Sequence, residues 1–205
     1  MEAFCAYHTA VDAVAINWRC FGSSGRALWS PMMTIDRFDR CAPEQHHSSL
    51  KFKSMHRTDR GYTAIGIHRP RGDAARDTYV YAGGPRVSDV LQMDIKQGKW
   101  QGTRAYHGVA QINHYTVRSR EEAHRKMARG RGTGKPAHTF NDYFNRFDLN
   151  HMEETSIARH AFKARRRYNE LMDDVILREL YRESCEVHLG RPAVPSAVTP
   201  ERDAA

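Results

Sequence analysis

The stretch AINWRCFGSSGR, residues 15–26, holds side chains whose types suit sugar recognition. Its aromatic rings offer flat faces for stacking, and its arginine can form a paired contact with a phosphate or carboxylate. The Gly-Ser-Ser-Gly turn can bring backbone N–H groups and hydroxyls close to a ligand. A plain strand-to-loop turn with a core tryptophan is the alternative, and the stretch lacks the GxxxxGK[ST] pattern of a Walker loop. The candidate residues are Trp18, Arg19, Phe21, Gly22, Ser23 and Ser24.

Two histidines, His68 in GIHRP and His114 in INHY, stand at the ends of expected strands. Strand ends are where α/β proteins place their site residues, and a neutral imidazole is a good ligand for a divalent transition metal. A structural or surface role is the alternative for each, because the chain has 12 histidines. In KFKSMHR, alternation puts Lys51 and Lys53 on one face of a strand. There they could neutralise a diphosphate or simply protect a sheet edge.

A third polar stretch, FDLNHMEETSIARH over 147–160, crowds Asp148, Asn150 and Glu153 before a helix. One carboxylate could take a proton from an acceptor hydroxyl, or hold a base or cation in place. Acidic residues near a helix N-terminus are also favoured by the helix dipole, so an ordinary capped helix is the alternative. The spacing leaves both interpretations open.

Size and composition fit one soluble globular domain of 205 residues, 40% of them hydrophobic and 27% charged. No stretch approaches the roughly 18 apolar residues of a membrane span, and the N-terminus lacks the basic start of a secretory signal. A cytoplasmic location and free thiols are expected, since the four cysteines form no CxxC pair. The net charge of +8 admits a nucleic-acid or anionic-surface binding module as an alternative function. The basic run over 118–131 forms no single helical stripe, which predicts a solvated helix with partial phosphate-binding capacity.

The elements that must position these residues alternate between strands and helices, which indicates an α/β fold. Strands are expected over 11–18, 50–57, 62–70, 78–84 and 110–115. Helices are expected over 32–41, 120–129 and about 152–184. Ser119 and Glu122 have the spacing of a capping box at the start of the second helix. We expect one domain over 1–189 and a disordered Pro/Ala-rich tail over 190–205.

Six stretches, in this order, resemble the bacterial glycosyltransferases of the family 2-like group related to family 92. They are DAVAINWRCFGSSGR, IDRFDRCAP, KFKSMHR, GIHRP, INHYTVRSREEAHRKMARGRG and FDLNHMEETSIARH, within about residues 12–160. The resemblance implies a GT-A type, Rossmann-like fold with a mixed sheet and flanking helices. It also implies transfer of a sugar from a nucleotide-sugar to a hydroxyl acceptor, in the synthesis of a surface polysaccharide or glycoconjugate.

The resemblance further implies roles for individual residues. Asp148 and Glu153 would be catalytic, and His68 and His114 would help to hold Mn²⁺ or Mg²⁺. The residues expected to bind substrate are Trp18, Arg19, Phe21, Gly22, Ser23, Ser24, Lys53, Asn113, Tyr115 and Asn150.

Members of the family carry a further half before the W-x-x-FG loop, with the first nucleotide-binding strands and an Asp-x-Asp metal motif. The present sequence resembles the C-terminal, acceptor-side portion, and Asp36 and Asp39 do not replace that motif because they follow the loop. We therefore expect a partial GT-A fold, a truncated enzyme with weak or no turnover, and no nucleic-acid partner. An exposed sheet edge could drive self-association. A non-catalytic assembly subunit, and association with the inner face of the membrane, stay open as alternatives.

Overall fold

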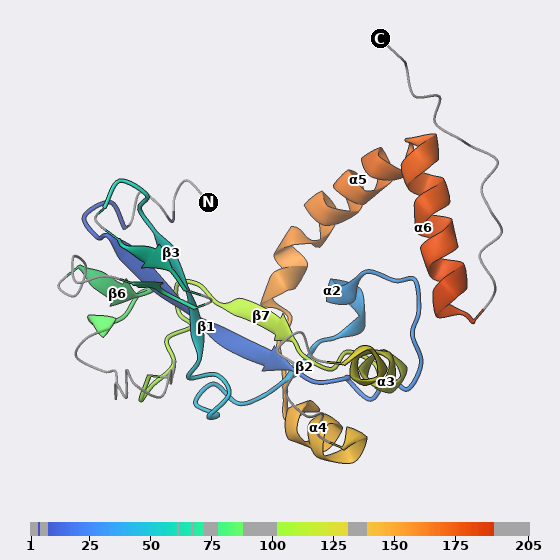
Figure 1. Ribbon diagram of the computed structural model, residues 1–205, viewed down its shortest axis with the longest axis horizontal. Coiled ribbons are helices and arrows are strands. Elements are labelled where there is room, and N and C mark those ends of the chain that lie inside the picture. The colour runs from blue at the N-terminus through green and yellow to red at the C-terminus, as the bar shows by residue number, and fades with distance from the viewer. Residues whose placement is uncertain are drawn as a thin grey trace, which may run out of the picture.

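The computed structural model of the chain describes residues 4, 8–60, 62–66, 68–71, 78–87, 102–130 and 139–190. It is a mixed α/β structure in which an open sheet carries helices, gathered near the end of the central strand (Figure 1). The expected α/β class, with a mixed sheet and flanking helices, is confirmed. Within the described residues, no helix has the length and apolar character needed to cross a membrane.

Strand β1, Ala13–Phe21, forms the centre of the main sheet. Its first half pairs antiparallel with β3, Phe52–His56, and parallel with β6, Tyr79–Tyr81. Its second half pairs parallel with β7, Ile112–Tyr115. Its last residue pairs antiparallel with β2, Arg40–Cys41. β1 therefore fixes the register of every strand that pairs with it.

Two further pairings do not involve β1. The short strand β8, Met152–Glu153, pairs antiparallel with β2. β4, Ala64–Ile65, and β5, Pro70–Arg71, form a separate two-stranded sheet. The single strand expected over 62–70 is therefore wrong, because the backbone reverses between Gly66 and Arg69, where an N–H to carbonyl bond of 2.9 Å closes the turn.

One hydrophobic cluster covers a single face of the first half of β1. Successive strand residues point to opposite faces, so Ala13 and Ala15 share a face with the residues paired to them, Tyr79 and Tyr81. Phe52 of β3 meets the ring of Tyr81 edge-on at 5.7 Å between ring centroids. This packing anchors the first half of β1, and the second half is left to position the candidate site.

Helix α3, Arg120–Arg129, begins and ends as the sequence predicts. The Ser119 hydroxyl accepts a hydrogen bond from the Glu122 N–H, and the Glu122 carboxylate accepts one from the Ser119 N–H, which confirms the capping box. Gly130 follows with φ 82°, in the left-handed region that favours glycine. The next helix, α4, Phe140–Phe147, packs Phe144 against Ala123 of α3 and against Val117, which precedes the helix.

The single long helix expected over 152–184 is wrong. The chain instead forms β8, a 3₁₀ helix (η3) over Ser156–His160, α5 over Ala161–Met172 and α6 over Val175–His188. The carboxylate of Asp174 accepts hydrogen bonds from Ile176 N–H and Leu177 N–H, so it caps a new helix and ends the previous one. The tail expected over 190–205 lies, from residue 191 onward, outside the described residues.

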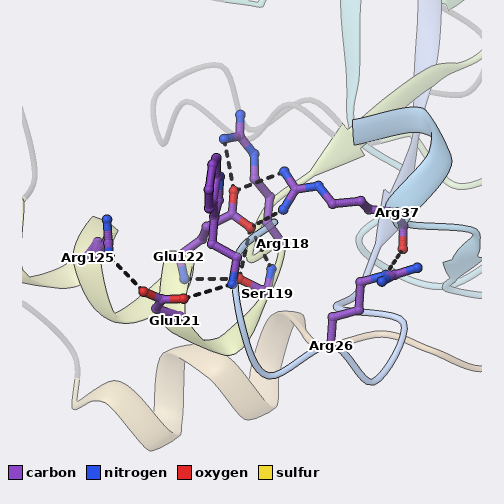
Figure 2. A network of polar contacts seen from close by, with 8 residues as sticks. Arg26, Arg37, Arg118, Ser119, Glu121, Glu122 and Arg125 are labelled. Atoms are coloured by element: carbon purple, nitrogen blue, oxygen red, sulfur yellow. Dashed lines mark hydrogen bonds and ion pairs between the residues drawn. The ribbon is translucent and has the colours of Figure 1, made fainter. Parts of the chain in front are cut away.

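Helix α2, Thr34–Arg37, is shorter than the helix expected over 32–41, because Arg40 and Cys41 join the sheet. Its last residue, Arg37, forms a buried ion pair with Glu122 of α3, with Nη1 2.8 Å from Oε2 (Figure 2). Burial disfavours the charged carboxylate, but hydrogen bonds from Arg37 and Ser119 outweigh it and hold the pKa of Glu122 below its usual value. The pair joins α2 to the start of α3.

Replacing Arg37 by Met should lower the free energy of unfolding by about 3–5 kcal/mol, because Glu122 would lose its buried guanidinium and keep only the Ser119 hydrogen bonds and the exposed Arg118 at 3.5 Å. Urea unfolding at neutral pH measures the loss. The control is Arg166→Met, which removes an exposed pair with Glu170 and should cost no more than about 0.5 kcal/mol. Equal losses in the two variants would contradict the role of the buried pair.

Candidate active site

The ends of β1 and β7 lie side by side and divide the predicted substrate-binding residues between two faces. The register pairs Trp18 with Ile112, Cys20 with His114, and Phe21 with Tyr115. Because side chains alternate along a strand, Trp18 and His114 share one face of the sheet. The opposite face holds Arg19, Phe21, Asn113 and Tyr115. The ten residues therefore cannot all line one pocket.

On the first face, four side chains gather around the indole of Trp18. The ring of His114 stacks on it with centroids 4.1 Å apart and planes within 2°. His68 lies against it at 5.5 Å with a tilt of 43°, and Lys51 Nζ stands 5.8 Å from the indole ring. Lys53, paired with Ile16, faces the same side. We call Trp18, Lys51, Lys53, His68 and His114 the Trp18 cluster.

Both imidazoles of the Trp18 cluster are uncharged at neutral pH. Burial, followed by the nearby charges of Lys126, Lys51 and Lys53, lowers the pKa of His114 to about 4. Burial also lowers the pKa of His68, although a hydrogen bond to the Phe52 carbonyl opposes the shift.

The polar atoms of His114 and Trp18 differ in their contacts. His114 Nδ1 and the Thr116 hydroxyl are 2.6 Å apart, which fixes the orientation of the ring. The buried indole N–H of Trp18 has no hydrogen-bond acceptor among the described residues. Because that N–H is buried from solvent, the groups that a ligand can reach are the imidazoles and the ammonium groups, which suit hydroxyl or phosphate oxygens.

A divalent cation does not fit the described residues of the Trp18 cluster. Within the described ranges, no three His, Cys, Asp or Glu side chains come together as a metal site would require. Lys51 and Lys53 add positive charge beside His68 and His114, which disfavours a cation further. The role of the two histidines in holding Mn²⁺ or Mg²⁺ stays a prediction, and no step below depends on a metal.

The opposite face buries a guanidinium. The side chain of Arg19 is 4% exposed, and its nearest carboxylate, Glu44 Oε1, lies 3.9 Å from Nη1. Nε and Nη1 of Arg19 make no hydrogen bond to any described residue. Beside it Asn113 accepts from Gln111 and donates to the Tyr115 hydroxyl at 3.3 Å. These contacts form a polar layer beneath the sheet, away from the Trp18 cluster.

The turn after β1 is held by the segment that carries the predicted acid Asp148. Ser23 N–H donates to Asp148 Oδ1 at 2.6 Å, and Ser24 N–H donates to Asn150 Oδ1 at 2.8 Å. Asn150 Nδ2 also donates to Asp148 Oδ1 at 2.8 Å. The carboxylate and amide therefore position the turn through its backbone N–H groups.

The two serine hydroxyls serve the turn as well. The Ser23 hydroxyl accepts from Gly25 N–H, and the Ser24 hydroxyl accepts from the N–H groups of Asp39 and Arg40. Glu153 lies on β8, paired with Arg40, and is exposed. The structure thus brings Asp148, Asn150 and the serine turn together, with Leu149 packed in one cluster with Trp18.

Sequence reasoning placed Lys51 beside Lys53 as a possible diphosphate contact but left Thr116 and Lys126 out of the predicted site. Thr116 stands two positions after His114, so period-two spacing could have found it. Lys126 comes from α3, donates to the Thr116 carbonyl at 2.8 Å and lowers the pKa of His114. Only the packing of α3 against β7 brings it there.

Gly22→Ala should lower the free energy of unfolding by about 1–3 kcal/mol, because the new methyl group would overlap Asn150 Oδ1 and stand 2.7 Å from Leu149 N. Chemical denaturation measures this loss of stability. Gly108→Ala is the matched control, since no atom lies within 4 Å of its added Cβ, and it should change stability by no more than about 0.5 kcal/mol. A Gly22 variant as stable as the control would mean that the turn is not held tightly.

Stability should fall between about pH 6.5 and about pH 4, because the unfolded chain takes up a proton at His114 that the folded chain refuses. Allowing for its partial exposure, His114 should contribute about 1–2 kcal/mol of this loss. His114→Gln should therefore flatten the pH dependence of unfolding measured in urea at several pH values. His160→Gln, an exposed histidine at the end of η3, should leave the slope unchanged.

Comparisons with protein-family models, with curated proteins and with solved structures find no match to this chain. Its function is therefore argued from the Trp18 cluster and from the turn that Asp148 holds.

Proposed function

We propose that this chain forms the sugar-facing part of a GT-A type glycosyltransferase, which moves a sugar from a nucleotide-sugar to a hydroxyl acceptor. The observation that supports the proposal is the Trp18 cluster at the end of the central strand. It combines an indole ring, two uncharged imidazoles and two lysines on one face of the sheet. These residues come from four of the six stretches that resemble the family, and the sheet brings them together.

The charges of the Trp18 cluster suit an anionic donor. Lys51 and Lys53 lie on the face of Trp18, where their ammonium groups can neutralise the diphosphate of a nucleotide-sugar. Uncharged His114 adds no positive charge beside Lys51 and Lys53, and its ring can exchange hydrogen bonds with sugar hydroxyls. The positive charge also stabilises the leaving diphosphate, on which negative charge builds during transfer.

Asp148 is the group best placed to take the proton of the acceptor. Its Oδ1 already accepts from Ser23 N–H and Asn150 Nδ2, while Oδ2 makes no hydrogen bond to a described residue. In the proposed step the acceptor oxygen bonds to the anomeric carbon as the bond from that carbon to the diphosphate oxygen breaks. The hydroxyl proton passes to Asp148 Oδ2, and the electron pair leaves with the nucleoside diphosphate. The bonds to Oδ1 hold the carboxylate in place.

Calorimetric titration with several UDP- and GDP-sugars, with and without Mn²⁺, tests the proposal. Trp18→Ala should weaken binding of the preferred sugar nucleotide by about 3- to 10-fold, the range that one aromatic contact supports. Phe162→Ala is the control, because that ring is 76% exposed on α5, in a different part of the chain.

Two outcomes would overturn the assignment. One is millimolar or weaker affinity for every sugar nucleotide, and the other is equal affinity in the Trp18 and Phe162 variants. Circular dichroism of each variant shows whether the fold is retained, so that loss of binding is not confused with unfolding.

A further inference from the structure

A cavity of about 450 Å³ opens where β7 passes into α3, beside the end of α6. This volume lies within the range of small-molecule sites. Its wall is mostly cationic. The polar residues that matter for its charge are Thr116, Arg118, Glu122, Arg125, Lys126 and Arg129.

The only carboxylate among the residues that line the cavity, that of Glu122, is already engaged. It receives the guanidinium of Arg37 from outside the cavity and the Ser119 hydroxyl at 2.9 Å, as Figure 2 shows. Arg118 approaches the same carboxylate at 3.5 Å. Glu122 thus has two arginines around it and cannot neutralise the remaining cations of the wall.

Arg125 is also engaged, and by structural partners. It pairs with Glu121 at 2.6 Å and donates to the carbonyls of Val187 and His188 at the end of α6. These bonds join α6 to α3, since the last carbonyls of a helix carry partial negative charge. Arg125 therefore shapes the cavity and ties its two walls together.

Neither Lys126 nor Arg129 forms an ion pair with a described residue. Lys126 donates to the Thr116 carbonyl, and its ammonium group lies 5.6 Å from the centroid of the Tyr143 ring, so its charge meets no carboxylate. Lys126 and Arg129 stand three residues apart on α3, so both project from one side of the helix. The backbone of Arg118 on the facing wall has φ 57°, a left-handed conformation that costs a non-glycine residue about 1 kcal/mol. Arg118 shares the Glu122 carboxylate with Arg37, and the charges of Lys126 and Arg129 are left without a carboxylate among the lining residues, which favours an anion in the hollow.

We propose that this cavity binds a diphosphate group, with Lys126, Arg129 and Arg118 as its cationic contacts. Several oxygens spread over two phosphorus centres match cations from α3 and from the turn before it better than a single carboxylate does. Thr116 and Lys126 also border the Trp18 cluster through His114, but Trp18, Lys51 and Lys53 do not line the cavity, so binding of a diphosphate here can be tested separately from sugar transfer.

Isothermal titration of the whole chain with inorganic pyrophosphate, UDP and monophosphate tests the proposal at about 50 mM salt, where phosphate contacts are still strong. Lys126→Gln/Arg129→Gln should weaken pyrophosphate binding at least 10-fold. The matched control, Arg159→Gln/Lys163→Gln, removes the same charge from exposed positions on η3 and α5 and should change affinity less than 2-fold.

Comparing the affinities for UDP and pyrophosphate distinguishes a nucleoside diphosphate from a free diphosphate. Tighter binding of UDP than of pyrophosphate, lost in the Lys126/Arg129 variant, supports a nucleoside diphosphate. Equal binding supports a free diphosphate. Equal losses in the two double variants would show that overall charge carries the binding, and would overturn the proposal. So would undetectable binding of pyrophosphate and UDP, or monophosphate binding as tight as pyrophosphate binding.

Discussion

The hydrogen-bond ladder of β1 is the constraint on which the rest of the structure depends. Four strands, β2, β3, β6 and β7, take their register from this strand, two of them parallel and two antiparallel. Because a strand alternates its side chains, each register decides which residues can meet. Trp18 meets His114 and the lysines of β3, while Arg19 on the other face meets a different set. A shift of one residue would exchange the two faces and separate the Trp18 cluster.

Buried and half-buried polar groups connect the elements around the end of β1. The buried Arg37–Glu122 pair joins α2 to α3, and the half-buried Asp148 and Asn150 hold the turn after β1. Such contacts stabilise only when each buried group finds a partner, and here the partners come from distant parts of the chain. The same contacts fix the positions of Asp148 and of the cavity wall. Residues that hold the fold together therefore also position the groups for which we propose chemical roles.

Helices α5 and α6 contribute little to this core. No residue of α6 is buried, and apolar side chains such as Ile176, Leu180 and Val187 stay more than half exposed. The contacts of α6 with the sheet end of the molecule include Arg125, the Tyr181 hydroxyl, which donates to the Pro31 carbonyl at 2.8 Å, and His188, which stacks on Trp29 at 4.7 Å. The C-terminal end of α6 closes one side of the basic cavity.

Local patterns in the sequence determined the elements whose causes are local. The apolar run around residues 11–18 predicts β1, and Ser119 with Glu122 and Gly130 predicts both ends of α3, because capping bonds form within a few residues. The sequence also placed Trp18, His68 and His114 among the site candidates. That Arg19 lies on the face opposite Trp18 follows from alternation along the predicted strand. Tertiary structure alone decided that Trp18, His68 and His114 meet, and that the end of α6 closes a cavity beside Arg118, Lys126 and Arg129. Both outcomes depend on strand register or helix packing between residues far apart in the chain, which residue type and spacing do not encode.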